Sequence, residues 1–497
     1  MIDPASLQVL GSALRGVAEE MGAALVRAAH SANIKERRDC STAVFDLAGR
    51  MIAQAEHMPV HLGAMPDAVA AVLELDPRPG AVYVLNDPYT GGTHLPDVTL
   101  VSLVDGIGLL VSRAHYADVG GMQPASLPVG ARELYQEGLI IPPLRLTDEV
   151  VQLMLANMRN PRERRADLRA QIACHDTGAA RLRELAERHG GERLRAGMGE
   201  LHAASERRIR AAIAALPDGI HIAEDVMEGD GLHSDDIVIR ATVAIRGDAL
   251  CVDFTGTAPQ QEGNVNCPIA VTRSAVYYVV RAVCDPDIPA SGGAYVPVQV
   301  VAPPGCLVNA ASPAAVVAGN VETSSRIVDV VLRAFAGMAD VPAMGQGTMN
   351  NVGFGNARFT HYETIGGGQG ACPDGPGPNA VHVAMSNTLN TPIEVLEREY
   401  PLLVERYAVR RRSGGAGTHR GGDGIVRAYR LLERMRVSVM TERRRHRPQG
   451  AAGGGPGAAG ENRLNGRRAP AKASFELAPG DLLEIRTPGG GGWGPPA

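Results

Sequence analysis

The chain is poor in aromatic residues and in paired cysteines. Only 4% of its 497 residues are aromatic, and there is a single Trp, so Ala, Val and Leu must fill most of the core. The seven Cys form no Cys-x-x-Cys pair and their number is odd, so a disulfide framework and a thiolate zinc site are both poorly supported. Reduced cysteines in a cytoplasmic protein are the simpler interpretation.

Long apolar runs and strong net charge are also missing. No stretch of about 18 apolar residues occurs, so no membrane-spanning helix is expected. The first stretch carries Asp3, Arg15 and Glu19 instead of the apolar core of a secretory signal. The formal charge of −5 favours neither nucleic acid nor an acidic membrane as a partner. We expect the compact basic run Arg443–Arg447 to be a solvated face or a subunit contact.

The common nucleotide-binding signatures are absent as well. There is no GxGxxG fingerprint and no Walker sequence, and no GK[ST] follows the glycine run Gly366–Gly370. That run could let a substrate approach the backbone, or it could merely form a turn. If the reaction consumes ATP, we do not expect this chain to bind it through a P-loop.

Hydrophobic patterning predicts a mixed, multi-domain α+β protein with strand-rich ends around a helical middle. Apolar residues three or four apart predict a first helix that Asp3 caps, with Pro4 in its first turn. Strands are predicted at 43–46, 81–85, 98–104, 109–111, 236–245, 249–254, 436–441 and 481–486, and a further helix at 326–336. The predicted regions are 1–146 (α+β, with the candidate metal site), 147–215 (helix-rich), 216–430 (central α+β) and 431–497 (β-rich). The Gly/Ala-rich residues 449–462 are expected to form a loop or a flexible insert.

The strongest chemical signal is the segment Asn86–Asp97 (NDPYTGGTHLPD), a predicted loop between two strands. Gly91 and Gly92 allow the backbone to turn sharply. His94 and Asp97 are three residues apart, a spacing that can bring an imidazole and a carboxylate to one point in a turn.

A second polar loop, residues 112–121, adds His115 and Asp118. If the adjoining strands are neighbours, both loops share one rim of the sheet. His94, Asp97 and His115 would then make a facial triad with open coordination positions, as in catalytic metal sites, and zinc, manganese or iron(II) would fit. Asp118 would suit the orientation of a ligand imidazole. The alternative is a polar loop with capping Asp residues and no metal.

His57 and His61 form another pair, at i and i+4. This spacing could bind metal on a helix, but Pro59 argues against a helix there. We therefore expect both side chains to line the same pocket instead of binding the ion.

The chain resembles the hydantoinase B/oxoprolinase family. The resemblance runs almost from end to end, and its most specific stretches are Asn86–Asp97, Ala114–Gly121 (AHYADVGG) and Arg132–Pro142 (RELYQEGLIIP). Further matching stretches are Arg38–Ser41, His57–Gly63, Asn264–Asn266 and Thr487–Gly494. One departure is Cys40, where family members often have an apolar or aromatic residue.

The resemblance implies a partner, an A-type chain with an actin-like ATPase fold, which phosphorylates the substrate in a hetero-oligomer such as (AB)2. In the carboxylase branch of the family, a His-x-x-Asp pattern and a downstream His hold a catalytic metal. That pattern corresponds here to His94, Asp97 and His115. The expected enzyme is a hydrolase of carbon–nitrogen bonds in cyclic amides, active only with its partner.

The expected chemistry begins with an amide carbonyl that resonance protects from water. Phosphorylation of its oxygen would create a reactive species that a metal-activated water can attack. Asp118 or Glu137 could move a proton. The residues expected to bind substrate are His57, His61, Asn86, Asp87 and Thr93.

Two alternatives remain at this point. The chain could be the metal-bearing subunit of an ATP-dependent ketone carboxylase, in which a phosphorylated enol attacks carbon dioxide. It could also be a non-catalytic scaffold that only completes the partner's site.

Overall fold

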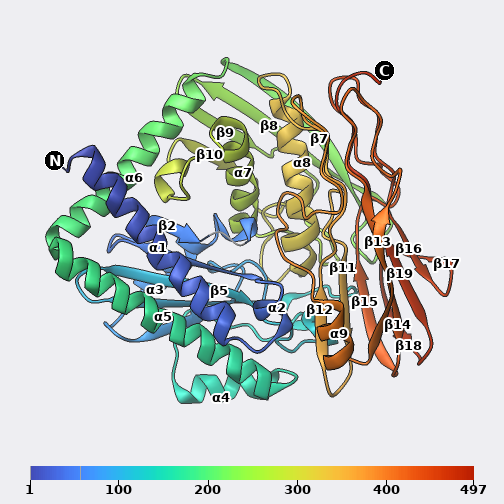
Figure 1. The fold of residues 1–497 in the computed structure, drawn as a ribbon, viewed down its shortest axis with the longest axis horizontal. Helices are drawn as coiled ribbons and strands as arrows, with labels where there is room; N and C mark the ends of the chain where they lie inside the picture. Colours follow the sequence, from blue (N-terminus) through green and yellow to red (C-terminus); the bar gives the residue numbers. More distant parts are fainter. Residues whose placement is uncertain (1, 56–57, 497) are drawn as a thin grey trace.

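The computed structural model describes residues 2–55 and 58–496. Within them, helices pack against four separate β-sheets (Figure 1). The predicted α+β class is confirmed. No helix in the described part of the chain is both long enough and apolar enough to cross a bilayer.

The first helix, α1 (Pro4–Ala28), begins as predicted. The Asp3 side chain accepts a hydrogen bond from the Ser6 amide, and Pro4 occupies the first turn. The buried face of α1 carries Leu10, Leu14, Val17, Met21 and Leu25. This stripe packs on the first sheet.

The first sheet has the strand order β2-β1-β5-β4-β3-β6. Its strands are β1 (Cys40–Phe45), β2 (Met51–Ala55), β3 (Val82–Leu85), β4 (Asp97–Val104), β5 (Gly108–His115) and β6 (Leu144–Arg145). Apolar side chains of α1 and α5 cover one face, and those of α3 and α7 cover the other. The short helices α2 (Ala32–Lys35) and α3 (Met65–Leu73) lie in its connections.

The predicted helical middle is confirmed. It consists of α4 (Asp148–Asn157), α5 (Pro161–His189) and α6 (Gly191–Ala214). Two of these helices flank α1 in Figure 1, with α5 running beside it and α6 crossing near the N-terminus.

A second sheet has the strand order β10-β9-β8-β7. It lies on the other side of the helices α7 and α8 from the first sheet. Its strands and these helices are β7 (Gly219–Glu228), β8 (Asp236–Arg246), β9 (Ala249–Asp253), β10 (Val298–Val301), α7 (Ile269–Cys284) and α8 (Ser324–Phe335). The helix predicted at 326–336 is thus confirmed as α8. A π-helical turn, η5 (Gly319–Thr323), leads into it.

Two further sheets form the C-terminal side of the molecule. One has the order β12-β11-β15-β18, with β11 (Asn351–Gly355), β12 (Thr360–Glu363), β15 (Met435–Met440) and β18 (Lys472–Leu477). The other has the order β13-β14-β19-β16-β17, with β13 (Leu402–Arg410), β14 (Gly424–Leu431), β16 (Glu461–Leu464), β17 (Arg467–Ala469) and β19 (Leu482–Arg486). The helix α9 (Ile393–Glu399) precedes β13. Both sheets take strands from either side of residue 430, so the predicted 430/431 boundary falls within them. The three boundaries between the four regions stay predictions.

Glycine-rich segments pack directly on one another next to these sheets. We call the segments 366–370, 413–424, 449–460 and 489–494 the glycine assembly. Their backbones are joined by bonds such as Gly490 N–H to Gly422 O (2.9 Å) and Gly492 N–H to Gly455 O (2.9 Å). A Cβ at Gly490 would lie 2.0 Å from a backbone oxygen, so no larger residue fits there. The loop expected within 449–462 is therefore a packed part of the fold.

The basic run 443–447 is a solvated face only in part, because Arg443 is buried whereas Arg445 and Arg447 are exposed, and the expected subunit contact stays a prediction. Arg443 is 1% exposed and pairs with Asp329 at 2.5 Å and Asp225 at 2.7 Å. Arg445 and His446 both reach Asp236. These basic side chains form ion pairs with acidic residues that are distant in the sequence. A local sequence pattern does not reveal such tertiary contacts.

Candidate metal centre

The strands β4 and β5 bring the two predicted loops together. They pair antiparallel with Asp97 opposite His115, so the first residue of one strand faces the last residue of the other. His94 lies three residues before Asp97, in a turn where the Asp97 amide donates to the His94 carbonyl at 3.0 Å. His115 thus ends a strand that is longer than the predicted one.

Gly91 and Gly92 make this turn possible. Gly91 has a φ of +101°, which favours glycine. A Cβ on Gly92 would lie 2.3 Å from the Asn86 carbonyl oxygen. The loop can therefore close tightly beneath His94 only with glycine at these positions.

Three buried side chains converge at ligand spacing. His94 Nε2 lies 3.1 Å from Asp97 Oδ1, His115 Nδ1 lies 3.0 Å from the same oxygen, and the two nitrogens are 3.2 Å apart. Ligands about 2.1 Å from one divalent ion at right angles to each other are about 3.0 Å apart. The donor set and its geometry therefore fit a single cation, and open positions would remain for water and substrate.

His61 lies against the same carboxylate. Its Nε2 is 3.4 Å from Asp97 Oδ2, while its Nδ1 shares a 2.9 Å hydrogen bond with the Ser41 hydroxyl. The Thr93 hydroxyl donates to Asp97 Oδ2 at 2.5 Å. Of the predicted substrate-binding residues, His61 and Thr93 are thus next to the triad, and Thr93 contacts a candidate metal ligand.

The charge state of the cluster suits a cation. Burial alone would raise the pKa of Asp97, but the His94 ring and the hydrogen bonds from His115 and His61 hold that pKa well below its usual value. Burial lowers the pKa of His61 despite its contact with Asp97. The carboxylate is therefore ionised and His61 favours its neutral form, which is the form that can bind a metal ion or accept a proton.

The other predicted substrate-binding residues lie differently. Asn86 donates to the carbonyls of Leu95 and Leu139 and accepts from the Ile141 amide, so its side chain fastens backbone segments together. Asp87 is half-buried and accepts from the Tyr89 amide. His57 lies outside the described residues.

Asp118 does not contact a ligand imidazole in the described structure. Its Oδ1 accepts from the amides of Gly120 and Arg159, and its Oδ2 accepts from the Ala125 amide and the Arg159 side chain. These bonds hold the loop after β5 in shape. The predicted role in orienting an imidazole has no contact to support it, because other donors already occupy both oxygens.

Glu137 is buried at the end of a short 3-10 turn. Its Oε1 accepts from the Val317 amide at 2.9 Å, and its Oε2 has no hydrogen-bond partner among the described residues. Burial raises its pKa to about 8. A carboxyl group that keeps its proton at neutral pH could act as an acid, but no hydrogen bond between described residues joins it to the triad.

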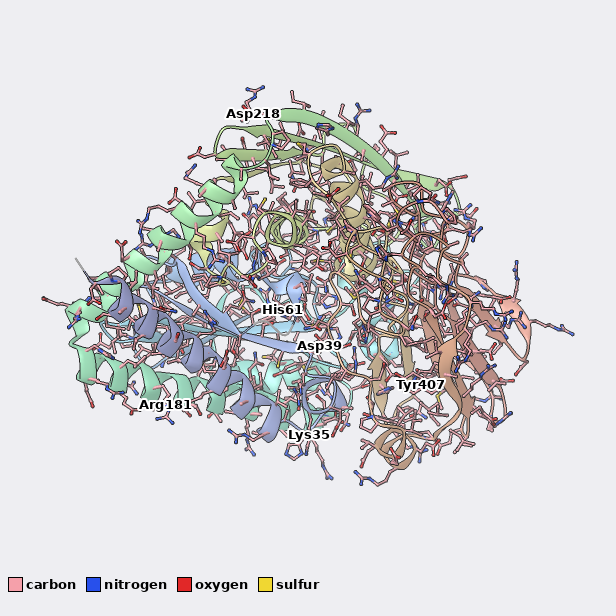
Figure 2. The ribbon with its side chains drawn as sticks, turned by 45° about the horizontal axis from the view of Figure 1, so that its top comes forward. Lys35, Asp39, His61, Arg181, Asp218 and Tyr407 are labelled. Carbon is pink, nitrogen blue, oxygen red and sulfur yellow. The ribbon has the colours of Figure 1, made fainter. Side chains whose placement is uncertain are left out.

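Asp39 is a neighbour of the site to which our sequence reasoning gave no role. The His115 amide donates to the Asp39 carbonyl at 3.0 Å. The paired register of β1 and β5 begins at the next residues, with Cys40 opposite Ala114. Because alternate residues of a strand share a face, the side chains of Asp39 and Ser41 lie on the face of Asp97 and His115. Figure 2 shows Asp39 and His61 in the interior of the molecule.

The Asp39 carboxylate accepts no hydrogen bond from any described residue. Its nearest cation is Arg37, at 3.8 Å. The residue is only 4% exposed, and a buried carboxylate ordinarily has donors. Its place in the motif Arg38–Ser41 was the available signal, but the motif does not say where the side chain points.

Tyr362 closes the site from a different sheet. Its ring stacks on the His115 ring with centroids 4.8 Å apart, and its hydroxyl donates to Asn351 at 2.6 Å. Asn351 in turn donates to the buried Glu322 at 2.6 Å. Nothing in the sequence around Tyr362 indicates that it contacts a residue about 250 positions away.

A family model described as Hydantoinase B/oxoprolinase matches residues 3–496. The chain belongs to the hydantoinase B/oxoprolinase family. The predicted resemblance is confirmed across the whole length.

Curated relatives of the family differ in size. The chain is 37% identical to 5-oxoprolinase 1 of Arabidopsis thaliana, covering 99% of this chain but 42% of the plant protein. It is 32% identical to a protein of a Pseudomonas strain that is provisionally named as the B component of a D-/L-hydantoinase, covering 100% of this chain and 90% of that protein. This hydantoinase B/oxoprolinase chain therefore corresponds to part of a longer polypeptide in one relative and to nearly all of a separate component in the other.

Two solved structures share the fold. An ATP-dependent caprolactamase from Pseudomonas jessenii superposes with a TM-score of 0.92 at 29% identity, covering 100% of this chain and 92% of that one. A nucleotide-free acetone carboxylase superposes with a TM-score of 0.90 at 17% identity, covering 99% and 76%. The second likeness concerns the fold alone.

Proposed function

We propose that this chain is the metal-carrying B-type subunit of an ATP-dependent cyclic-amide hydrolase, with catalysis shared with a partner ATPase subunit. The observation that carries the proposal is the buried cluster of His94, Asp97 and His115 at ligand spacing. The relatives named as a 5-oxoprolinase, a hydantoinase component and a caprolactamase support a cyclic amide as the substrate class.

The chemistry begins in the partner, which transfers a phosphoryl group from ATP to the amide oxygen. Water then adds to the ring carbon, the carbon–nitrogen bond breaks as the nitrogen takes a proton, and hydrolysis of the resulting acyl phosphate releases phosphate. A divalent zinc, manganese or iron ion held by the triad would polarise oxygen and make water more acidic.

The residues around the triad divide the remaining work. Thr93 and His61 fix the second oxygen of Asp97, which keeps Oδ1 directed at the two imidazoles. Asp39 offers an acceptor for a substrate N–H or for a proton of water. Burial of all these groups strengthens their interactions and excludes bulk water from a reactive intermediate.

The test uses the chain co-expressed with an A-type partner. The complex is assayed on hydantoin, 5-oxoproline and simple ketones, with and without bicarbonate, and its metal content is measured. We expect ATP-dependent ring opening and about one divalent ion per chain. ATP turnover that requires bicarbonate would instead support the carboxylase alternative.

The variant His94→Ala distinguishes the enzyme from the scaffold. We expect it to lose the metal and to lower activity by at least about 100-fold, because one of only three protein ligands is gone. The variant His189→Ala, at a half-buried position at the end of α5 and outside the triad, is the matched control and should keep both. Full activity of metal-free His94→Ala protein would mean that the chain is a scaffold.

A further inference from the structure

A cavity of about 670 Å³ lies beside β2, and none of the three triad residues lines it. Its walls come from α1, β2, α6 and the loop 286–291. Figure 1 shows α1 beside β2, with α6 crossing α1. The volume is within the range of ligand sites. The cavity is therefore a second candidate site.

The strand β2 is an edge strand that borders this cavity. It pairs with β1 on one side only. In an antiparallel pair, alternate residues of an edge strand turn their N–H and C=O groups outward. The backbone of residues 52–55 makes no hydrogen bond to any described residue outside that pair. At one end, the Ser291 hydroxyl donates to the Met51 carbonyl at 3.4 Å.

These edge residues are buried all the same. Ile52, Ala53, Gln54 and Ala55 are each between 4% and 6% exposed. The side-chain amide of Gln54 also has no hydrogen-bond partner among the described residues at either end. Buried backbone and amide groups are nearly always paired in proteins. The edge of β2 therefore presents backbone N–H and C=O groups, unpaired within the described chain, that a parallel or antiparallel extended segment could pair with.

Several small residues of α1 line the cavity next to β2. The helix presents Gly11, Gly22 and Ala23 to the cavity, next to the longer side chains of Arg15, Glu19 and Arg27. A strand added to a sheet lies about 4.8 Å from its neighbour, and the loop 286–291 bounds the space on the other side.

The rim of the cavity is positively charged. Arg15, Arg27 and Arg38 are exposed, and none of them forms an ion pair with a described carboxylate. Arg281 also lines the cavity. Against the three exposed arginines stand Glu19 and Asp287, the only carboxylates among the described lining residues. The charge favours an acidic occupant.

We infer that an extended, acidic segment of the partner polypeptide adds to the sheet along β2 and fills this cavity. A small molecule would satisfy one donor–acceptor pair, whereas an extended backbone satisfies every outward group of residues 52–55. The arginine rim then pairs with acidic side chains of the segment. This inference rests on the proposed function for the existence of that partner.

The test compares hydrogen exchange of the chain alone with that of the co-expressed complex. We expect the outward amides of residues 52–55 to exchange about tenfold more slowly, or slower still, in the complex. Arg15→Glu should weaken association by about tenfold, and Arg15→Lys should restore it. Arg183→Glu, an exposed position on α5 that does not line the cavity, is the matched control and should associate normally.

The outcomes separate the two proposals. A complex that forms and hydrolyses cyclic amides, with unchanged exchange in residues 52–55 and normal association of Arg15→Glu, overturns the inference and leaves the proposed function standing. Failure of any A-type chain to associate overturns both. Protection of the same amides in the isolated chain by ATP or 5-oxoproline overturns the inference in favour of a small-molecule site.

Discussion

The carboxylate of Asp39 shares a sheet face with Asp97 and His115 and has no hydrogen-bond donor among the described residues. We predict that Asp39→Asn lowers kcat by about 100-fold or more, because the weaker acceptor loses its contact with substrate or water. Metal content should stay near the wild-type value, since Asp39 is not among the three candidate ligands. Steady-state kinetics with metal analysis checks this, and wild-type kcat would contradict it.

Glu137 gives the protein a pH dependence of known sign. Burial raises its pKa from 4.5 to about 8, so the native state keeps a proton that the unfolded chain has lost. Its contribution to stability is therefore present at low pH and is lost as pH rises from about 4.5 to about 8. The loss is on the order of a few kcal/mol.

The variant Glu137→Gln tests this assignment. It keeps an acceptor for the Val317 amide but has no proton to lose. We predict that its free energy of unfolding, measured with urea at pH 5.5 and 8.5, falls less with pH than that of the wild type. Parallel curves for the two proteins would mean that Glu137 is not the titrating group.

The loop between β3 and β4 acts as one element that places His94. We predict that Gly92→Ala moves this loop, because the new methyl would lie 2.3 Å from the Asn86 oxygen. The expected result is a loss of metal binding together with about 2–4 kcal/mol of stability. Gly130→Ala is the control, since nothing lies within 4 Å of its added Cβ. Calorimetry with metal titration measures both, and normal metal affinity in Gly92→Ala would count against this account.

Elements with a local pattern could be predicted from the sequence. The apolar stripe of α1 and the strands β4 and β5 follow from periodicity, and the hairpin of β4 and β5 then brings Asp97 and His115 together. Asp39 could not be assigned in the same way, because only the register of β1 against β5 places it at the site. The expectation for Arg443 was wrong for the same reason: its acidic partners lie in β7 and α8.

At the scale of the whole molecule, two sheets that are distant in sequence meet at the candidate metal site. Tyr362, in β12, stacks on His115, and Asn351, in β11, holds its hydroxyl. We predict that Tyr362→Leu weakens metal affinity by about 10–100-fold, because His115 loses the surface that orients its ring. Tyr362→Phe keeps the stacked ring and should lose much less.

The spectrum of the cobalt-substituted protein provides the measurement, because it reports ligand geometry directly. A changed spectrum in Tyr362→Leu with a near-normal one in Tyr362→Phe is the expected pattern. Identical spectra in all three proteins would show that packing between the sheets does not position His115.

The glycine assembly has a thermodynamic consequence for the whole chain. Its segments meet through peptide groups at distances that admit no Cβ, as at Gly490, so this part of the protein hides amide surface and little hydrocarbon. Exposure of amide surface on melting lowers the heat capacity increment, whereas exposure of hydrocarbon raises it. The heat capacity change of unfolding per residue should therefore be smaller than for a domain with an ordinary hydrophobic core. The free energy of unfolding should then depend less steeply on temperature.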